Sequence, residues 1–138
     1  MSKFKNKFLS ILSILIFVAC NSSNDARGLK KIKLNRDTCT RCTMTISDPR
    51  YISQVVMPKV TKAFDDVGCA VHWIKENKIT KFKIYVKDID TNKYINAKTA
   101  YYSIGTSPMG YNFAAHKIKN KKNKFTYDEM SKIVKSKR

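Results

Sequence analysis

The chain has 138 residues, with 28 lysines and arginines against 10 aspartates and glutamates and a formal net charge of +18. This length accommodates one compact domain or two small lobes. Such a basic balance favours anionic partners, and counterion release makes nucleic acid the first candidate. The chain has no ordered nucleic-acid recognition motif, and it begins with an export signal. We therefore interpret the lysines as a solvated face and expect no nucleic-acid binding.

The first residues have the pattern of a bacterial lipoprotein signal. A lysine-rich start at residues 3–7 precedes an apolar run over residues 8–18, shorter than the roughly 20 residues that span a bilayer. Small Ala19 before Cys20 suits signal cleavage and lipidation of the cysteine. We expect residues 1–19 to be the signal peptide, residues 20–30 the lipidated N-terminus and a polar tether, and residues 31–138 the folded domain.

The next informative segment runs from Asp37 to Ile46 and places Cys39, Cys42 and Met44 within six positions. Thiolates and thioethers are soft ligands, and this ligand set favours Cu(I) over harder ions. The threonines around the cysteines favour an extended strand, in which residues two apart share a face. We therefore expect Cys42 and Met44 to present their sulfur atoms on one side, with Cys39 on the preceding turn.

Two alternatives use the same cysteines. Cys39-x-x-Cys42 and Cys69-x-x-His72 together form the Cys3His set of many structural zinc sites, although this set leaves Met44 without a role. A Cys39–Cys42 disulfide would instead indicate a thiol–disulfide exchange protein. Cys69 itself lies beside an apolar helical stripe, where a core thiol is more common than a ligand.

The hydrophobic pattern predicts a small α+β protein. The expected elements, in chain order, are strands at residues 51–57 and 60–64, a helix at 67–77, a strand at 82–88, a strand pattern over 94–104 with a bend near Asn96, and a helix at 126–135. Asp65 or Asp66 is placed to cap the first helix. This order gives strand–strand–helix–strand in the first half and a weaker repeat of it in the second.

Three motifs follow one another along the chain: Cys39-Thr-Arg-Cys42-Thr-Met44, Phe64-Asp65-Asp66-Val67-Gly68-Cys69 through Trp73, and Ser107-Pro108-Met109-Gly110 through Ala115. Together they resemble the NosL family of periplasmic copper-binding lipoproteins, from about Asp37 to Met130. The resemblance implies two related ββαβ lobes, Cu(I) as cargo and a lipid-anchored position on the periplasmic side of a bacterial membrane. It also implies two partners, an ABC-type membrane complex and a copper-receiving enzyme, nitrous oxide reductase.

The resemblance also suggests ligands. The family's Cys-x-Met element falls on Cys42 and Met44, and Met109 becomes a candidate third ligand. Cys39 and His116 are further candidates. The family has a helix after Ala115 that is not expected here, so we predict a shortened second lobe. Because we find no Ser-His-Asp arrangement and no phosphate-binding glycine loop in the sequence, we expect a protein that binds and hands over copper, not an enzyme.

Overall fold

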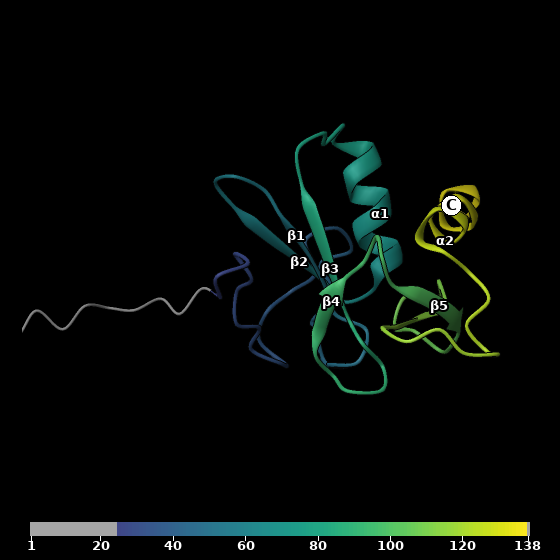
Figure 1. Ribbon diagram of the computed structural model, residues 1–138. Helices are drawn as coiled ribbons and strands as arrows, with labels where there is room; N and C mark the ends of the chain where they lie inside the picture. Colours follow the sequence, from purple (N-terminus) through teal and green to yellow (C-terminus); the bar gives the residue numbers. More distant parts are fainter. Residues whose placement is uncertain (1–24, 138) are drawn as a thin grey trace, which may run out of the picture.

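The computed structural model describes residues 25–137. The predicted signal peptide and the predicted lipidation site at Cys20 lie outside the described residues. The described chain folds into two sheets and two helices (Figure 1), which confirms the predicted α+β class. None of the helices in this part of the chain has the length and apolar character needed to cross a membrane.

The first lobe is a four-stranded antiparallel sheet of order β2-β1-β3-β4 with helix α1 packed on it. Its elements are β1 (Ser53–Val56), β2 (Thr61–Phe64), α1 (Val67–Glu76), β3 (Lys83–Lys87) and β4 (Tyr94–Asn96). Strand β1 is central because it pairs with both β2 and β3, with Ser53 opposite Phe64 on one side and Val86 on the other. The predicted strand–strand–helix–strand order is confirmed for this half.

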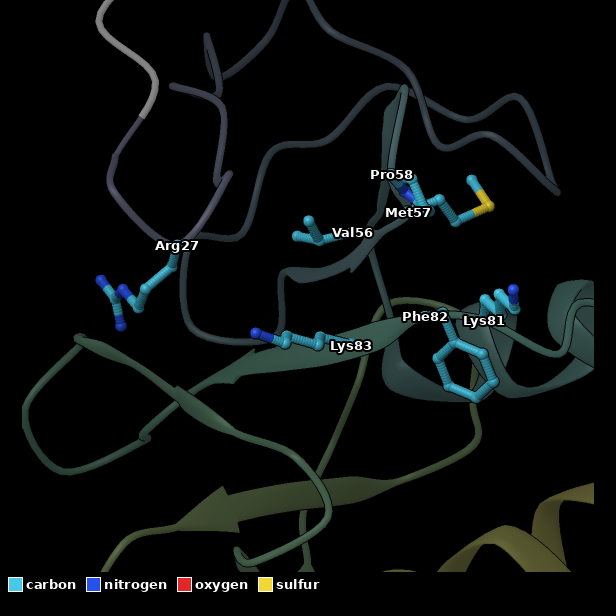
Figure 2. Close-up of a pocket in the computed structure, with 7 residues that line it drawn as sticks. All are labelled: Arg27, Val56, Met57, Pro58, Lys81, Phe82 and Lys83. Carbon is cyan, nitrogen blue, oxygen red and sulfur yellow. The ribbon is translucent and has the colours of Figure 1, made fainter.

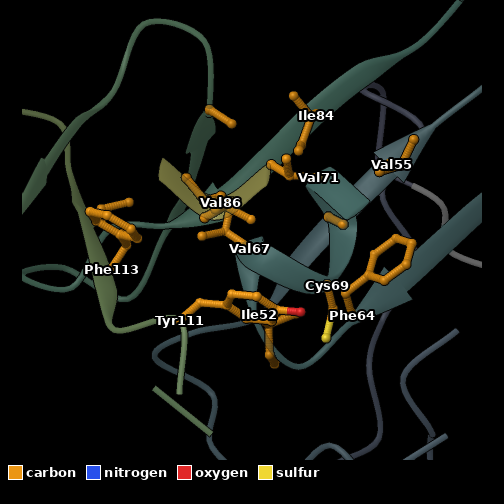
Figure 3. Close-up of a cluster of buried hydrophobic side chains, with 14 of the residues drawn as sticks. Ile52, Val55, Phe64, Val67, Cys69, Val71, Ile84, Val86, Tyr111 and Phe113 are labelled. Carbon is orange, nitrogen blue, oxygen red and sulfur yellow. The ribbon is translucent and has the colours of Figure 1, made fainter. Parts of the chain in front are cut away.

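The core of the first lobe lies between α1 and the sheet (Figure 3). Val67 and Val71 of α1 contribute to the same buried cluster as Ile84 of β3. Burial of such aliphatic side chains contributes about 1.5–3 kcal/mol each. The Phe64 ring at the end of β2 packs against Trp73 in the second half of α1, with centroids 5.6 Å apart, and only Asp65 and Asp66 separate β2 from α1. That junction carries the candidate site.

The second lobe is smaller and consists of a two-stranded antiparallel sheet and one helix. Its elements are β5 (Tyr101–Ile104), β6 (Phe113–His116) and α2 (Tyr127–Ser136). Helix α2 packs against both β5 and α1. It begins with a capping box, in which Thr126 N donates to Glu129 Oε2 at 2.8 Å and Glu129 N donates to Thr126 Oγ1 at 3.4 Å. The predicted terminal helix is therefore confirmed.

The strand pattern over residues 94–104 divides at the expected bend into β4 and β5. Residues 117–126 contain no helix, as expected. The second lobe nevertheless has a helix, α2, further along the chain. Strand β6 was not predicted. It joins the lobes through Ala115, whose carbonyl accepts from Ile89 N at 2.9 Å.

Candidate metal centre

The segment around Cys39 and Cys42 is a tight turn, and the predicted extended strand is wrong here. Thr38 and Thr45 form an isolated antiparallel bridge, Cys39 N donates to Met44 O at 2.8 Å, and Thr43 N donates to Cys39 O at 3.0 Å. Thr43 has a left-handed backbone with φ of 63°. The expectation that Cys42 and Met44 share one face of a strand therefore does not apply. The turn instead brings the two cysteines together.

Two contacts fix this turn against the rest of the molecule. Thr40 N donates to Ala63 O of β2 at 2.9 Å. The Arg41 guanidinium donates to the Glu76 carboxylate at distances of 2.8 to 3.1 Å. Its Nη1 also donates to Tyr111 Oη at 3.1 Å. A paired guanidinium and carboxylate has directional geometry, so it orients as well as attracts. The turn is thus held by β2, by the end of α1 and by the chain before β6.

The turn places Cys39 and Cys42 beside Cys69 of α1 and Asp65 of the β2–α1 junction. One ligand atom from each of these residues lies within 4.8 Å of the others. We call Cys39, Cys42, Asp65 and Cys69 the thiol cluster. The Cys42 thiol donates to the Asp65 carboxylate, with Sγ at 3.5 Å from Oδ2, and all three cysteines are free thiols. Three soft donors and one carboxylate thus converge on one point.

The shared environment separates the pKa values of the three thiols. A hydrogen bond from the Cys69 thiol, aided by backbone groups of the turn, lowers the pKa of Cys39 to about 4 although burial opposes this. That same hydrogen bond, together with burial, raises the pKa of Cys69. Burial raises the pKa of Cys42 to about 11. Without a metal, Cys39 is therefore the thiol that ionises first.

Asp65 and Asp66 have different roles, although the sequence suggested that either caps α1. Asp66 is the cap, since its Oδ1 accepts from Gly68 N at 3.0 Å. Asp65 joins the thiol cluster, where burial and the nearby Cys39 raise its pKa to about 6. Both of its carboxylate oxygens lie within 3.6 Å of Cys42 Sγ, on the side of the thiols.

The second oxygen of Asp66 ties the second lobe to the site. Asp66 Oδ2 accepts from the Ser107 hydroxyl and from Met109 N, the latter at 3.2 Å. The Ser107–Gly110 turn is thereby fixed at the start of α1, next in sequence to the residues of the thiol cluster. Gly110 has φ of 74°, which allows the tight turn. Met109 is partly buried at this junction.

The remaining sequence candidates lie in different places. Met44 is 58% exposed, so its thioether stands at the surface beside the turn. His116 is not part of the thiol cluster. It groups instead with Asp88 and Asp90. His72, the fourth member of the Cys3His alternative, is also outside the thiol cluster, and its Nε2 has no hydrogen-bond partner among the described residues. The structure therefore brings together three cysteines without an imidazole.

Sequence reasoning missed Asp65 as a site residue and placed Cys69 in the core. Cys69 is indeed fully buried, and Figure 3 shows it on α1 near Phe64. The signal that marks both residues is Asp65-Asp66-x-x-Cys69. Only one of two adjacent acids can cap a helix, so the other is free for another role.

Surface hollows elsewhere do not involve the thiol cluster. The hollow in Figure 2 has a volume of about 340 Å³ and is lined by Arg27, Val56, Met57, Pro58, Lys81, Phe82 and Lys83. Its apolar base and basic rim contain no cysteine, histidine or carboxylate. Met57 has the same thioether side chain as Met44, but it lies in this hollow and not at the thiol cluster. It is therefore a useful control for substitutions of Met44.

Comparison with known proteins supports one family. The NosL family model matches residues 31–137. The crystal structure of the copper chaperone NosL from Shewanella denitrificans matches with a TM-score of 0.56 and 14% identity, covering 81% of this chain and 89% of that chain. At this identity the likeness is one of fold. No curated protein matches the chain significantly. Because the family model covers most of the sequence, the chain belongs to the NosL family.

Proposed function

We propose that this protein is an exported Cu(I)-binding metallochaperone that carries copper and passes it to a recipient protein. The observation that carries the proposal is the convergence of three free thiols and one carboxylate within 4.8 Å of one another. Thiolates are soft ligands that suit Cu(I). Family membership and the resemblance in fold to a copper chaperone support the same reading.

The sulfur donors in and beside the thiol cluster differ in their exposure to solvent. This difference suggests the side from which copper enters and leaves the site. Cys39 and Cys69 are buried, Cys42 is partly buried and Met44 is exposed. We infer that Cu(I) is held by Cys39, Cys42 and Cys69, and that Met44 is the outer donor through which it arrives and leaves. A neutral thioether is displaced more easily than a thiolate. Met109, fixed by Asp66, is the candidate donor on the side of the second lobe.

Transfer needs a site that admits a ligand from the recipient. A Cu(I) ion held by two or three sulfur atoms keeps room for one more, so the recipient's donor can bind before a Met44 or Cys42 bond breaks. The net result is movement of the ion without redox change. Copper is cargo in this scheme, and the protein performs no catalytic turnover.

The surroundings of this activity also form part of the proposal. We expect lipidation of Cys20 to hold the domain on the periplasmic side of a bacterial membrane. We expect nitrous oxide reductase to be the recipient and an ABC-type membrane complex to assist. These expectations rest on the resemblance to the family and on the sequence pattern before residue 25.

A structural zinc site remains the competing function, in changed form. Asp65 takes the place that the sequence suggested for His72, giving a Cys3Asp set that zinc accepts. In that case all four residues would be required equally and Met44 would have no role. A thiol–disulfide exchange role would instead require a redox-active pair among the same three cysteines.

The test is an anaerobic competition titration of the reduced chain from Asn21 to Arg138, with Cu(I) and Zn(II) each set against a chromophoric chelator. We expect one tightly bound Cu(I), lost in Cys42→Ser and weakened about ten-fold or more in Met44→Ala. Met57→Ala is the matched thioether control and should bind as the wild type does. Unchanged Cu(I) affinity in Cys42→Ser would overturn the proposal. Tight zinc binding that needs Asp65 but ignores Met44 would establish the zinc domain instead.

A further inference from the structure

A second group of possible ligands lies where the two lobes meet. One carboxylate oxygen from each of Asp88 and Asp90 and one ring nitrogen of His116 lie within 4.8 Å of one another. We call these residues the carboxylate–imidazole cluster. It shares no residue with the thiol cluster and it contains no sulfur. Its elements also differ, since the two acids follow β3 and the histidine ends β6.

The backbone holds this cluster in place. After β3 the chain turns tightly, with Asp88 N donating to Lys93 O at 2.8 Å and Asn92 N donating to Asp88 O at 2.7 Å. Ile89 N donates to Ala115 O at 2.9 Å, next to His116. The loop that carries both acids is thus tied to the strand that carries the imidazole. The three donors need only small movements to meet.

Asp88 has an unusual environment for a carboxylate. Its residue is only 3% exposed, yet its side chain accepts only from Asp90 N at 3.2 Å and from Thr91 Oγ1 at 2.9 Å. Asp88 forms no ion pair among the described residues. The ion pairs found there involve Asp25, Asp48, Glu76 and Asp90. A buried carboxylate without a cation is costly. A bound cation would supply the missing charge.

His116 is oriented as metal-binding histidines usually are. Its Nε2 lies 2.7 Å from Ser103 Oγ, and its Nδ1 lies 2.8 Å from Asp90 Oδ2. If Nε2–H donates to Ser103, the Nδ1 lone pair points toward the two carboxylates. A partner on the second ring nitrogen is the common arrangement around histidine ligands, where it fixes the tautomer. An ion bound at Nδ1 would lie between the ring and Asp90 Oδ2.

We propose that Asp88, Asp90 and His116 form a second metal site for a divalent ion of the zinc type. One imidazole and two carboxylates suit Zn²⁺ and related divalent ions and do not suit Cu(I). The molecule thus has a soft site and a harder site built from different ligands. Because the ligands come from both lobes, the ion would also link the loop after β3 to the end of β6.

The site opens to a wide groove. Asp90, Ser103 and His116 line a hollow of about 900 Å³, together with Ile104, Asn120, Lys121, Lys122, Lys124 and Phe125. The three lysines are exposed, so solvent screens their repulsion of the ion, whereas the carboxylates contact it directly. Three protein ligands leave coordination positions for an anion from solution.

A Ser-His-Asp arrangement was not expected from the sequence, and this expectation is wrong for the structure, because Ser103, His116 and Asp90 form a hydrogen-bond chain. The order matches that of a nucleophile, a base and an orienting acid. Two features oppose catalysis. Ser103 lies within β5 opposite Ala114 and not on an exposed turn, and the side chain of Asp90 is 62% exposed. Asp88 also has no place in that scheme. The metal site accounts for all four residues.

The experiment uses Co(II) as a spectroscopic substitute for Zn(II), added to the reduced chain from Asn21 to Arg138. Co(II) bound to thiolates has a sulfur-to-metal charge-transfer band, whereas Co(II) at the carboxylate–imidazole cluster has only d–d bands. We expect an ion without the charge-transfer band that broadens the NMR signals of the His116 ring. The chain has two histidines. The His72 ring, one helical turn from Cys69, reports on any Co(II) bound at the thiol cluster and so distinguishes it from an ion at His116.

Asp90→Asn is the decisive variant because Asp90 is exposed and its loss leaves the buried Asp88 in place. We expect its affinity for this ion to fall about ten-fold or more, while the charge-transfer band of any thiolate-bound Co(II) stays unchanged. Asp128→Asn, which removes an equal charge at the start of α2, should bind normally. Equal binding by Asp90→Asn and the wild type, or no Co(II) effect on His116, would overturn the proposal. Failure of copper binding at the thiol cluster would not affect it.

Discussion

The Asp66 carboxylate joins helix α1 to the second lobe, because it caps Gly68 N with one oxygen and accepts from Ser107 with the other. Burial raises its pKa, opposed by the Ser107 hydrogen bond. Two lobes that contact mainly through α1 and α2 thus share a second, polar link. The link also fixes Met109, so one residue controls both stability and the geometry beside the thiol cluster.

Asp66→Ala should lower the free energy of unfolding by about 1–3 kcal/mol, because it removes a helix cap and leaves the Ser107 hydroxyl and Met109 N without their acceptor. Urea unfolding of the metal-free chain measures this. Ser107→Ala should cost less, since the cap remains. If the effects of the two substitutions add fully in the double variant, the Asp66–Ser107 contact is not the link described here.

Gly68 is required because the Tyr111 ring lies directly against the first turn of α1. A Cβ on residue 68 would lie 2.1 Å from Tyr111 Cγ. Tyr111 is itself held by Arg41 at its hydroxyl and packs on His72, with ring centroids 5.4 Å apart. Gly68→Ala should therefore destabilise the fold by about 1–3 kcal/mol, although alanine is the better helix former.

The Tyr111→Ala background supplies the check for this prediction. With the ring absent, the added methyl group has space, and Gly68→Ala should cost much less than in the wild type. Thermal unfolding of the four chains gives the coupling energy. An equal cost in both backgrounds would mean that the ring is not what excludes a side chain at position 68.

Much of the fold was predictable because local patterns and tertiary packing agree. Helix α1 has apolar residues at helical spacing and an aspartate cap, and α2 has two acidic residues in its first turn, so both were expected within a residue or two. Strand β6 was missed because Phe113-Ala-Ala-His116 is buried at every position and has no alternation to detect. Its pairing with β5 supplies what the local sequence does not.

The site was harder to predict, for two physical reasons. Convergence of Cys69 and Asp65 on the Cys39–Cys42 turn is a tertiary contact across about 25 residues. The Asp65-Asp66-x-x-Cys69 pattern marks the two residues as candidates but does not say which segment they meet. The turn itself contradicts local propensity, because threonines favour strands. Here Thr43 takes a left-handed backbone, with its hydroxyl donating to Cys42 O at 2.6 Å. The site is thus located where local preference and structure disagree.

That disagreement is testable at Thr43. A left-handed backbone costs a residue with a side chain about 1–2 kcal/mol. Glycine avoids this cost, but it loses more conformational entropy on folding, which cancels part of the gain in stability. Thr43→Gly should therefore raise the free energy of unfolding by about 0.5–1 kcal/mol, measured by urea unfolding. Thr45→Gly is the matched control at an extended position of the same turn and should destabilise. A loss of stability in Thr43→Gly would contradict the strained backbone.

The last prediction concerns pH and the metal-free thiol cluster. The pKa of Cys39 is lowered to about 4 from an ordinary 9.0, so between about pH 6 and 9 the unfolded chain binds a proton that the folded chain does not. Stability should then rise with pH in this window. Below about pH 6 the folded chain protonates Asp65, whose pKa is raised to about 6, before the unfolded chain does. The two effects oppose each other there and flatten the dependence.

Above pH 9 the sign reverses, because Cys42 and Cys69 have raised pKa values and keep their protons in the folded chain while the unfolded thiols ionise. Stability of the reduced, metal-free chain should thus be greatest near pH 9. Urea midpoints measured across the range test this, with Cys39→Ser as the comparison, since titrating groups outside the thiol cluster are common to both chains and the other groups of the cluster titrate mainly outside the range from pH 6 to pH 9. The difference between the two chains should grow in favour of the wild type from about pH 6 to pH 9. If the difference in stability between the two chains stays constant from pH 6 to pH 9, Cys39 does not ionise first, and the lowered pKa assigned to Cys39 is wrong.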